Sequence, residues 1–164
     1  MRQPSDESQN LFDVSGKTVI VTGAGSGLGA GYARAFGRAG AVTVCAGRSM
    51  DTLERTAAAI REAGGQALAL TADVTDTDSI HSFMEQVRQR TGRVDVLVNN
   101  AGFEHVEDFL SVTPEHFDSI MNVNLKGAYF MAQAAARAMQ DSGGKIINIG
   151  SLGSYIGLAG SSVY

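Results

Sequence analysis

A glycine-rich segment, TGAGSGLG at residues 22–29, follows a run of β-branched residues and precedes a stretch with helical periodicity. Glycines let a backbone approach phosphate groups closely, and the N-terminus of a helix offers unpaired N–H groups and the positive end of a dipole. The glycines have G-x-x-x-G-x-G spacing, whereas the commoner G-x-G-x-x-G spacing is not met, because Leu28 stands at its last position. We therefore predict a pyrophosphate site, formed by Gly23, Ser26, Gly27, Leu28 and Gly29. The alternative is a tight strand-to-helix turn that holds no ligand.

The residues after the next predicted strand indicate which dinucleotide the site would take. A carboxylate about 20 positions after the glycines would bind a ribose 2′-hydroxyl and favour NAD. Here the strand is followed by Gly47, Arg48 and Ser49. Since no carboxylate stands there to repel a 2′-phosphate, and the Arg48 guanidinium is suited to hold one, the sequence favours NADP(H), with NAD(H) as the alternative cofactor. Arg48 could also be an ordinary solvated surface arginine.

Short polar residues follow two further predicted strands. Asp73 and Val74 come after the third strand, and the segment NNAG, residues 99–102, ends the fourth. Such side chains can hydrogen-bond an adenine amine and brace neighbouring strand ends against a cofactor. The predicted cofactor contacts of these segments are Asp73, Val74, Asn100, Ala101 and Gly102. The alternative is turn chemistry alone, since Asn, Asp and Gly favour turns on their own account.

The elements that must position these residues alternate between strands and helices. Apolar, β-branched runs predict strands, and longer stretches of helical period predict helices. The predicted strands are 17–22, 42–46, 67–72, 94–99 and 145–149, and the predicted helices are 27–39, 51–63, 76–90 and 113 to about 140. We expect a capping box of Asp51 and Glu54 in the second helix, and Thr113 with Pro114 at the start of the fourth. This alternation requires parallel pairing with right-handed crossovers, and so predicts a doubly wound, three-layer α/β/α sheet of the Rossmann type, whose ligands lie beyond the carboxyl ends of the strands.

Charge and composition exclude several classes of function. A net charge of -4 argues against nucleic-acid or anionic-membrane partners, which require a basic face, and no apolar run is long enough to span a bilayer. Cys45 is the only cysteine in the sequence, so a reducing, cytoplasmic location is expected. The three histidines have no metal-ligand spacing. The cluster of Glu104, His105, Glu107 and Asp108 could hold a cation but is more typical of an exposed polar loop beside a substrate pocket, so we expect no metal.

Five motifs, taken in order, resemble those of the classical short-chain dehydrogenases/reductases. They are TGAGSGLG, Asp73 with Val74, NNAG, NVNLKG at residues 122–127, and INIGS at residues 147–151 leading to Tyr164. The resemblance begins at about Val14, so we expect an NAD(P)-binding Rossmann domain at residues 14–164, preceded by an N-terminal extension at residues 1–13. The segments LFD and SGK near the start, and Gly47 with Arg48, are most similar to the gluconate 5-dehydrogenase and 3-oxoacyl-carrier-protein reductase branches.

The resemblance also implies a catalytic set. Tyr164 would be the general acid, or the base in oxidation, and Ser151 would hold the carbonyl oxygen; the two residues are 13 positions apart, as in the family. Asn124 would bind a water in the proton relay. Without the family context, Asn124 would be read as a polar residue that kinks a helix.

The family has a lysine four residues after this tyrosine, and the sequence ends before that position. A free phenol has a pKa of about 10, too high for ready proton exchange at neutral pH, and the family's lysine lowers it while also gripping the nicotinamide ribose. We therefore expect a Rossmann domain that is incomplete at its C-terminus and truncated after the fifth strand. The chain as given is expected to be inactive or nearly so.

Together these features predict an oxidoreductase that transfers a hydride between NADP(H) and a small-molecule carbonyl or secondary alcohol. In full-length form it is expected to be a homo-oligomer, a dimer or a tetramer, because the apolar helix at residues 128–139 suits a subunit interface; that helix could also be buried within its own subunit. Two other functions stay open. One is a non-catalytic module that binds a dinucleotide, and the other is a subunit-interaction module with no cofactor affinity.

Overall fold

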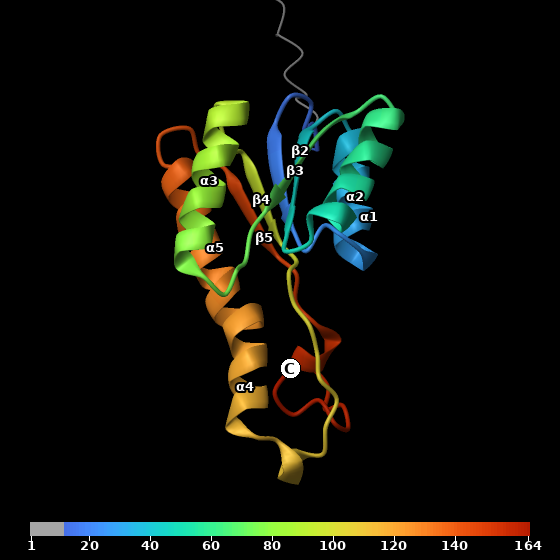
Figure 1. Cartoon of the computed structure of the whole chain (residues 1–164), viewed down its shortest axis with the longest axis vertical. Helices are drawn as coiled ribbons and strands as arrows, with labels where there is room; N and C mark the ends of the chain where they lie inside the picture. The colour runs from blue at the N-terminus through green and yellow to red at the C-terminus, as the bar shows by residue number, and fades with distance from the viewer. Residues whose placement is uncertain (1–11) are drawn as a thin grey trace, which may run out of the picture.

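The computed structural model describes residues 12–164, so nearly all of the predicted N-terminal extension, residues 1–11, lies outside the described part of the chain. Within the described residues, five parallel strands form one sheet in the order β3-β2-β1-β4-β5 (Figure 1). The strands are β1 (Thr18–Thr22), β2 (Val42–Gly47), β3 (Gln66–Thr71), β4 (Val96–Asn99) and β5 (Lys145–Asn148). Strand order reverses beside β1, because the chain moves outward to β3 and then returns to β4 on the other side. The doubly wound Rossmann fold is thereby confirmed.

Helices cover both faces of the sheet and complete the three layers (Figure 1). On one face lie α1 (Gly27–Arg38) and α2 (Met50–Glu62), and on the other lie α3 (Thr77–Thr91) and α5 (Ala128–Ala138). Side chains of β1 alternate between two apolar cores, since Val19 and Val21 belong to one and Ile20 to the other. None of the helices between residues 12 and 164 has the length and hydropathy that a membrane-spanning segment needs.

β5 is an exposed edge strand. It pairs with β4 on one side, and all four of its residues are exposed. Ile146 and Ile147 expose 39% and 42% of their surface. In the part of the chain that the structure describes, no strand pairs with the outer edge of β5, and such an edge favours association.

A buried carboxylate joins the amino ends of β1 and β4. The backbone N–H of Thr18 donates to Asp95 Oδ2 at 2.9 Å, and Arg93 Nε donates to the same oxygen at 2.8 Å. Lys17 Nζ lies 3.9 Å from Asp95 Oδ1. Burial acts to raise the pKa of Asp95, but the Arg93 and Thr18 hydrogen bonds and the two cations outweigh it, so the pKa lies below its usual value.

Two helix starts test the predicted capping residues. Thr113 is the N-cap of α4 (Pro114–Met121), and its side chain accepts from the backbone N–H of His116, as predicted. The prediction of a capping box of Asp51 and Glu54 in α2 is wrong. Ser49 is the N-cap of that helix and makes no side-chain cap bond, so Asp51 lies inside the first turn, while Glu54 forms an ion pair with Arg61.

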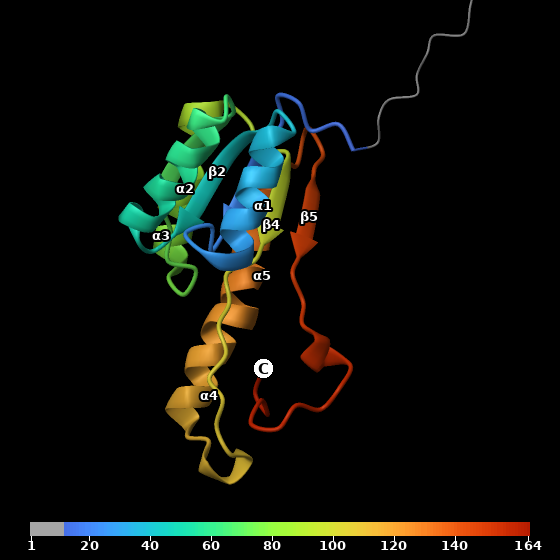
Figure 2. The ribbon, with the colours of Figure 1, turned by 90° about the vertical axis from the view of Figure 1, so that its right-hand side faces the viewer.

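The helix predicted from residue 113 to about 140 consists of three parts. α4 is followed by a π-helix, η2 (Asn122–Gly127), and then by α5. Short 3-10 helices, η1 (Phe109–Ser111) and η3 (Leu152–Ser154), interrupt the two long loops. Together with α4, these loops extend beyond the carboxyl ends of the strands and form a second, smaller part of the molecule (Figure 2). A π-helix within an α-helical region frequently marks a functional site.

Candidate active site

A cavity of about 680 Å³ lies beyond the carboxyl ends of the strands, where the sheet meets the loops and η2. Its volume is within the range of small-molecule and cofactor sites. All fourteen site residues predicted from the sequence line this one cavity: Gly23, Ser26, Gly27, Leu28, Gly29, Arg48, Asp73, Val74, Asn100, Ala101, Gly102, Asn124, Ser151 and Tyr164. The fold therefore brings together residues that are spread over 142 positions of the sequence, from Gly23 to Tyr164.

The glycine-rich turn after β1 leaves the N-terminus of α1 open to the cavity. Gly27 has a φ of 52°, in the left-handed region, and a Cβ at this position would meet no atom within 4 Å. At Gly29 a Cβ would collide with the carbonyl oxygen of Gly23, so this helix can start against the strand only without a side chain. Ser26, the N-cap of α1, makes no side-chain bond to the helix. This geometry suits the binding of a phosphate group.

Arg48 and Asp73 follow the neighbouring strands β2 and β3 and place opposite charges on one side of the cavity. Arg48 is exposed at the cavity rim. Asp73 Oδ1 accepts from Thr75, from its N–H at 2.9 Å and from its hydroxyl at 2.7 Å. These two bonds, with a smaller contribution from the Arg48 charge, lower the pKa of Asp73 below its usual value. Asp73 thus forms the turn that was its alternative reading, and it also lines the cavity.

Thr22, the last residue of β1, holds the end of β4 in place, and the sequence-based reasoning missed it. Its hydroxyl oxygen accepts from the backbone N–H of Asn100 at 3.0 Å and from that of Ala101 at 2.9 Å. Asn100 Nδ2 in turn donates to the Thr22 carbonyl at 3.0 Å. The only signal in the sequence was a hydroxyl residue directly before the glycines.

Asn99 braces the other side of β4. Its Nδ2 donates to Asn148 Oδ1 on β5 at 3.0 Å and to the carbonyl of Ala128 at 2.9 Å. This amide therefore ties two strand ends to the start of α5, which is the bracing predicted for this segment. Nine further residues line the cavity: Thr22, Ala46, Gly47, Ala72, Phe103, Val123, Ile149, Gly150 and Val163.

Asn124 lies in η2 and pairs with the loop that follows β4. Its Oδ1 accepts from the backbone N–H of Phe103 at 3.0 Å, and its Nδ2 donates to the Phe103 carbonyl at 2.9 Å. The oxygen and the nitrogen of this side-chain amide thus both bind the main chain of one residue, Phe103. The pairing holds the loop over one wall of the cavity and keeps η2 against it.

Ser151 and Tyr164 lie on the segment after β5 and come close together around Gly153. Ser151 Oγ accepts from the N–H of Gly153 at 3.1 Å. A Cβ built on Gly153 would lie 3.5 Å from Ser151 Oγ and 3.8 Å from Tyr164 Cδ1. Tyr164 exposes 43% of its surface and lines the cavity. Within residues 12–164, no hydrogen bond joins the Ser151 and Tyr164 hydroxyls.

A parallel sheet with a glycine-rich turn after β1 and a cavity at the carboxyl ends of its strands defines a dinucleotide-binding class of protein. Comparison with known sequences identifies the family within this class. A family model for short chain dehydrogenases matches residues 17–164. The chain belongs to this family.

Individual relatives agree with this assignment. The chain is 39% identical over 155 residues to a ketoacyl reductase, HetN, of Nostoc sp. (strain PCC 7120), covering 94% of this chain and 54% of that protein. It is 39% identical over 152 residues to the 2-dehydro-3-deoxy-D-gluconate 5-dehydrogenase of Escherichia coli (strain K12), covering 90% and 58%. The chain therefore spans little more than half the length of these curated relatives.

A solved structure gives the same fold. A metagenomic short-chain oxidoreductase in complex with NADP is 37% identical and superimposes with a TM-score of 0.87, covering 93% of this chain and 70% of that one. The resemblance to the short-chain dehydrogenases/reductases, including the gluconate dehydrogenase and ketoacyl reductase branches, is thereby confirmed.

Proposed function

We propose that the protein, at its full natural length, transfers a hydride between NADP(H) and a small-molecule carbonyl or secondary alcohol. The observation that carries this proposal is the convergence of all fourteen predicted cofactor and catalytic residues on one cavity at the carboxyl edge of the sheet. Bound there, NADPH would supply the hydride. The residues of this chain would bind its phosphates, orient the substrate and handle the proton.

The two hydroxyls beside Gly153 take complementary roles in this proposal. Ser151 Oγ uses a lone pair to accept from the Gly153 N–H, so its own hydrogen is free to donate to a substrate carbonyl oxygen. That bond would stabilise the negative charge that develops on the oxygen during reduction. Tyr164 lies beside the same glycine, and its hydroxyl would deliver the proton to this oxygen, or remove it in the oxidation.

Asn124 would contribute to the proton relay, with a restriction that the structure adds. One Nδ2 hydrogen and one Oδ1 lone pair are engaged by the Phe103 backbone. A relay water would therefore bind the second Nδ2 hydrogen, the second lone pair or the main chain of the π-helix. In addition, Asn124 positions the loop beside the substrate.

Arg48 supports a preference for NADPH over NADH. It is exposed at the cavity rim directly after β2, where a guanidinium can form charge-assisted bonds to a 2′-phosphate. Replacing Arg48 by Gln should weaken NADPH binding by about 10- to 100-fold, which corresponds to the loss of one charged hydrogen-bonding group. Binding of NADH should change by less than about twofold. Equal effects on both cofactors in a fluorescence titration would remove Arg48 as the selecting residue.

Turnover tests the catalytic roles. NADPH oxidation is followed with a panel of ketones, using the full-length protein and its Tyr164→Phe and Ser151→Ala variants. Each variant should lose most of kcat, by about 100-fold or more, while the NADPH dissociation constant stays unchanged. Full activity in both variants would refute the assignment.

We also propose that a polypeptide ending at Tyr164 binds the dinucleotide without turnover. Free phenols exchange protons poorly at neutral pH, and residues 146–164 contain no lysine or arginine that could favour the phenolate. The turnover assay, together with NADPH titration, also tests the two alternative functions, a non-catalytic dinucleotide-binding module and a subunit-interaction module. A cofactor-sensing module would bind NADPH but show no turnover at full length, and a subunit-interaction module would not bind NADPH.

We further propose that the full-length protein forms a homo-oligomer and acts in the cytoplasm. Apolar side chains along α4, η2 and α5 are exposed: Phe117 by 46%, Leu125 by 59% and Tyr129 by 62%. The opposite side of α5 is buried in its own subunit through Met131 and Ala135, so only the exposed face of this helix is available for the proposed interface. Sedimentation equilibrium should give a dimer or a tetramer, whereas a monomer at micromolar concentration would contradict the interface.

A further inference from the structure

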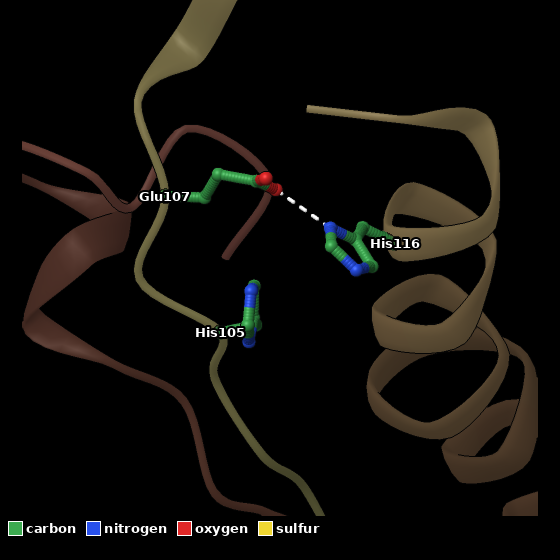
Figure 3. Close-up of side chains that lie close together, drawn as sticks. All are labelled: His105, Glu107 and His116. Atoms are coloured by element: carbon green, nitrogen blue, oxygen red, sulfur yellow. Dashed lines mark hydrogen bonds and ion pairs between the residues drawn. The ribbon is translucent and has the colours of Figure 1, made fainter. Parts of the chain in front are cut away.

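Two histidines and a glutamate meet beside the active-site loop, although they are not adjacent in the sequence. His105 and Glu107 lie on the loop after β4, and His116 lies in the first turn of α4 (Figure 3). Each side chain offers one ligand atom, and these three atoms lie within 4.8 Å of one another. His116 Nδ1 is 2.7 Å from Glu107 Oε2. The ring of His105 stands 4.6 Å from that of His116, measured between centroids, with an angle of 51° between the planes.

We propose that His105, Glu107 and His116 form a binding site for a divalent transition-metal ion, with Zn²⁺ as the ion that fits best. Two imidazoles and one carboxylate are a donor set that Zn²⁺ takes in proteins, with a fourth position left for water. This inference goes beyond the proposed oxidoreductase function and does not depend on it. It also departs from the expectation of no metal, which rested on linear spacing and could not anticipate that α4 places His116 against the loop.

The present geometry is close to what a tetrahedral site needs. With Zn–N and Zn–O distances of about 2.0 to 2.2 Å, neighbouring ligand atoms are about 3.3 to 3.6 Å apart. His116 Nδ1 and Glu107 Oε2 are 2.7 Å apart, and one ligand atom from each of the three residues lies within 4.8 Å of the others, so shifts of about 1 Å would place them around one ion. His105 is exposed and free to make such a shift. On metal binding, the proton between His116 and Glu107 would leave and the two atoms would separate slightly.

The surrounding charge favours a cation. Residues 99–125, which follow β4 and include the cluster, contain five aspartates and glutamates and no lysine or arginine, and a local excess of one sign concentrates ions of the other. Within this segment the side chain of Glu107 is only 20% exposed, and the residue that pairs with it is a histidine. A divalent ion carries two positive charges, whereas an imidazole carries at most one, so the ion would compensate this carboxylate more fully.

A metal here would join two segments that border the active site, the loop after β4 and α4. His105 and Glu107 belong to the loop whose residue Phe103 pairs with Asn124. The backbone N–H of Glu107 donates to the carbonyl of Gly160 at 2.8 Å, only four residues before Tyr164. Joining this loop to α4 would therefore restrain the wall of the cavity and the segment that carries the tyrosine. The proposed role is structural, a clamp on the loop.

Calorimetric titration with ZnCl₂ tests the site. The protein is purified without a polyhistidine tag and treated with EDTA, which is then removed by dialysis. We expect one Zn²⁺ per chain, bound with a micromolar or lower dissociation constant. His105→Asn, Glu107→Gln and His116→Asn should each weaken binding by at least about 10-fold, since even indirect metal partners contribute that much. His81→Asn is the matched control, because His81 is an exposed histidine on α3, away from the cluster, and should leave binding unchanged.

Two further measurements exclude indirect effects. Circular dichroism melts without metal should be nearly the same for the wild type and His105→Asn, and Zn²⁺ at about 100 times its dissociation constant should raise the melting temperature of the wild type alone by about 5 to 10 °C. Cobalt binding should give the intense visible absorption of a tetrahedral ion, and His116→Asn should abolish it. A dissociation constant for Zn²⁺ above about 100 μM would be far too weak for a structural zinc site and would overturn the proposal. Binding that survives in all three cluster variants, or that is lost equally in His81→Asn, would also overturn it.

Discussion

Replacing Thr22 by Val removes a single hydroxyl and keeps the shape of a buried side chain. Thr22 is 1% exposed, and its oxygen accepts the backbone N–H groups of Asn100 and Ala101. The substitution leaves both N–H groups without that acceptor at the point where β4 enters the active site. Thr43 on the neighbouring strand β2 is the matched control. It is fully buried, and within residues 12–164 its hydroxyl is the buried side-chain group that has no hydrogen-bond partner.

The expected effects have opposite signs. A buried donor that loses its acceptor costs about 1 to 3 kcal/mol. Because Asn100 and Ala101 are partly exposed and water can reach them, we take the lower part of this range for each of the two N–H groups. Thr22→Val should therefore reduce the free energy of unfolding by about 2 to 3 kcal/mol in total. Thr43→Val removes a hydroxyl whose burial is uncompensated, and should raise the free energy of unfolding by about 1 kcal/mol.

Urea unfolding followed by circular dichroism measures both changes on the same protein. The m-value should stay constant, so that the shift in midpoint reports stability alone. Thr22→Val should also weaken NADPH binding, because the two N–H groups belong to residues that line the cavity. Equal destabilisation by the two variants would show that the Thr22 hydroxyl has no special role, and the account of how β4 is positioned would then be wrong.

Three further predictions follow from the same structure. The pKa of Asp95 is lowered in the folded state, so its contribution to stability is full above its unfolded pKa of about 3.9 and is lost as the pH falls through the folded value. Between about pH 5 and 2, Asp95→Asn should therefore lose less stability than the wild type. A parallel loss in the two proteins would contradict this. Burial raises the pKa of the Cys45 thiol to about 11, so a thiol reagent at pH 8 should label it only in denaturant; rapid labelling of the native protein would count against a closed core. Gly29→Ala should destabilise the protein by about 1 to 3 kcal/mol, because the new methyl group is overpacked against Gly23. Gly31→Ala on the same helix meets open space and should stabilise the protein by up to about 1 kcal/mol. A higher melting temperature for Gly29→Ala than for Gly31→Ala would contradict the packing.

The strands and the glycine turn could be predicted because their signals are local. The run TVIVT is β-branched and fully buried, and the glycines that follow it restrict the chain to a turn before a helix. Parallel strands then bring their carboxyl ends to one edge, so motifs that follow successive strands had to meet there. The assignment of Arg48 and Asn100 to a common cavity needed no more than this topology.

Features that depend on tertiary contacts could not be predicted in this way. Helical periodicity runs through residues 113–140 without a visible break, but Asn124 pairs with the Phe103 backbone and a π-helix interrupts the run. The supporting role of Thr22 depends on a segment 78 residues away. In the same way, His116 comes beside Glu107 only because α4 folds back along the loop after β4.

Binding of a nicotinamide dinucleotide by the cavity is the central claim, and a fluorescence titration with NADPH tests it most directly. The wild type is compared with Ser26→Glu, which places a carboxylate where the phosphates should lie. A negative charge at the N-terminus of α1 should leave the melting temperature equal or slightly higher. The account predicts saturable 1:1 binding by the wild type and binding at least about 10-fold weaker in the variant, because like charges repel. If the wild type fails to bind, or if the folded variant binds equally well, the glycine turn is not a phosphate site and the account is contradicted.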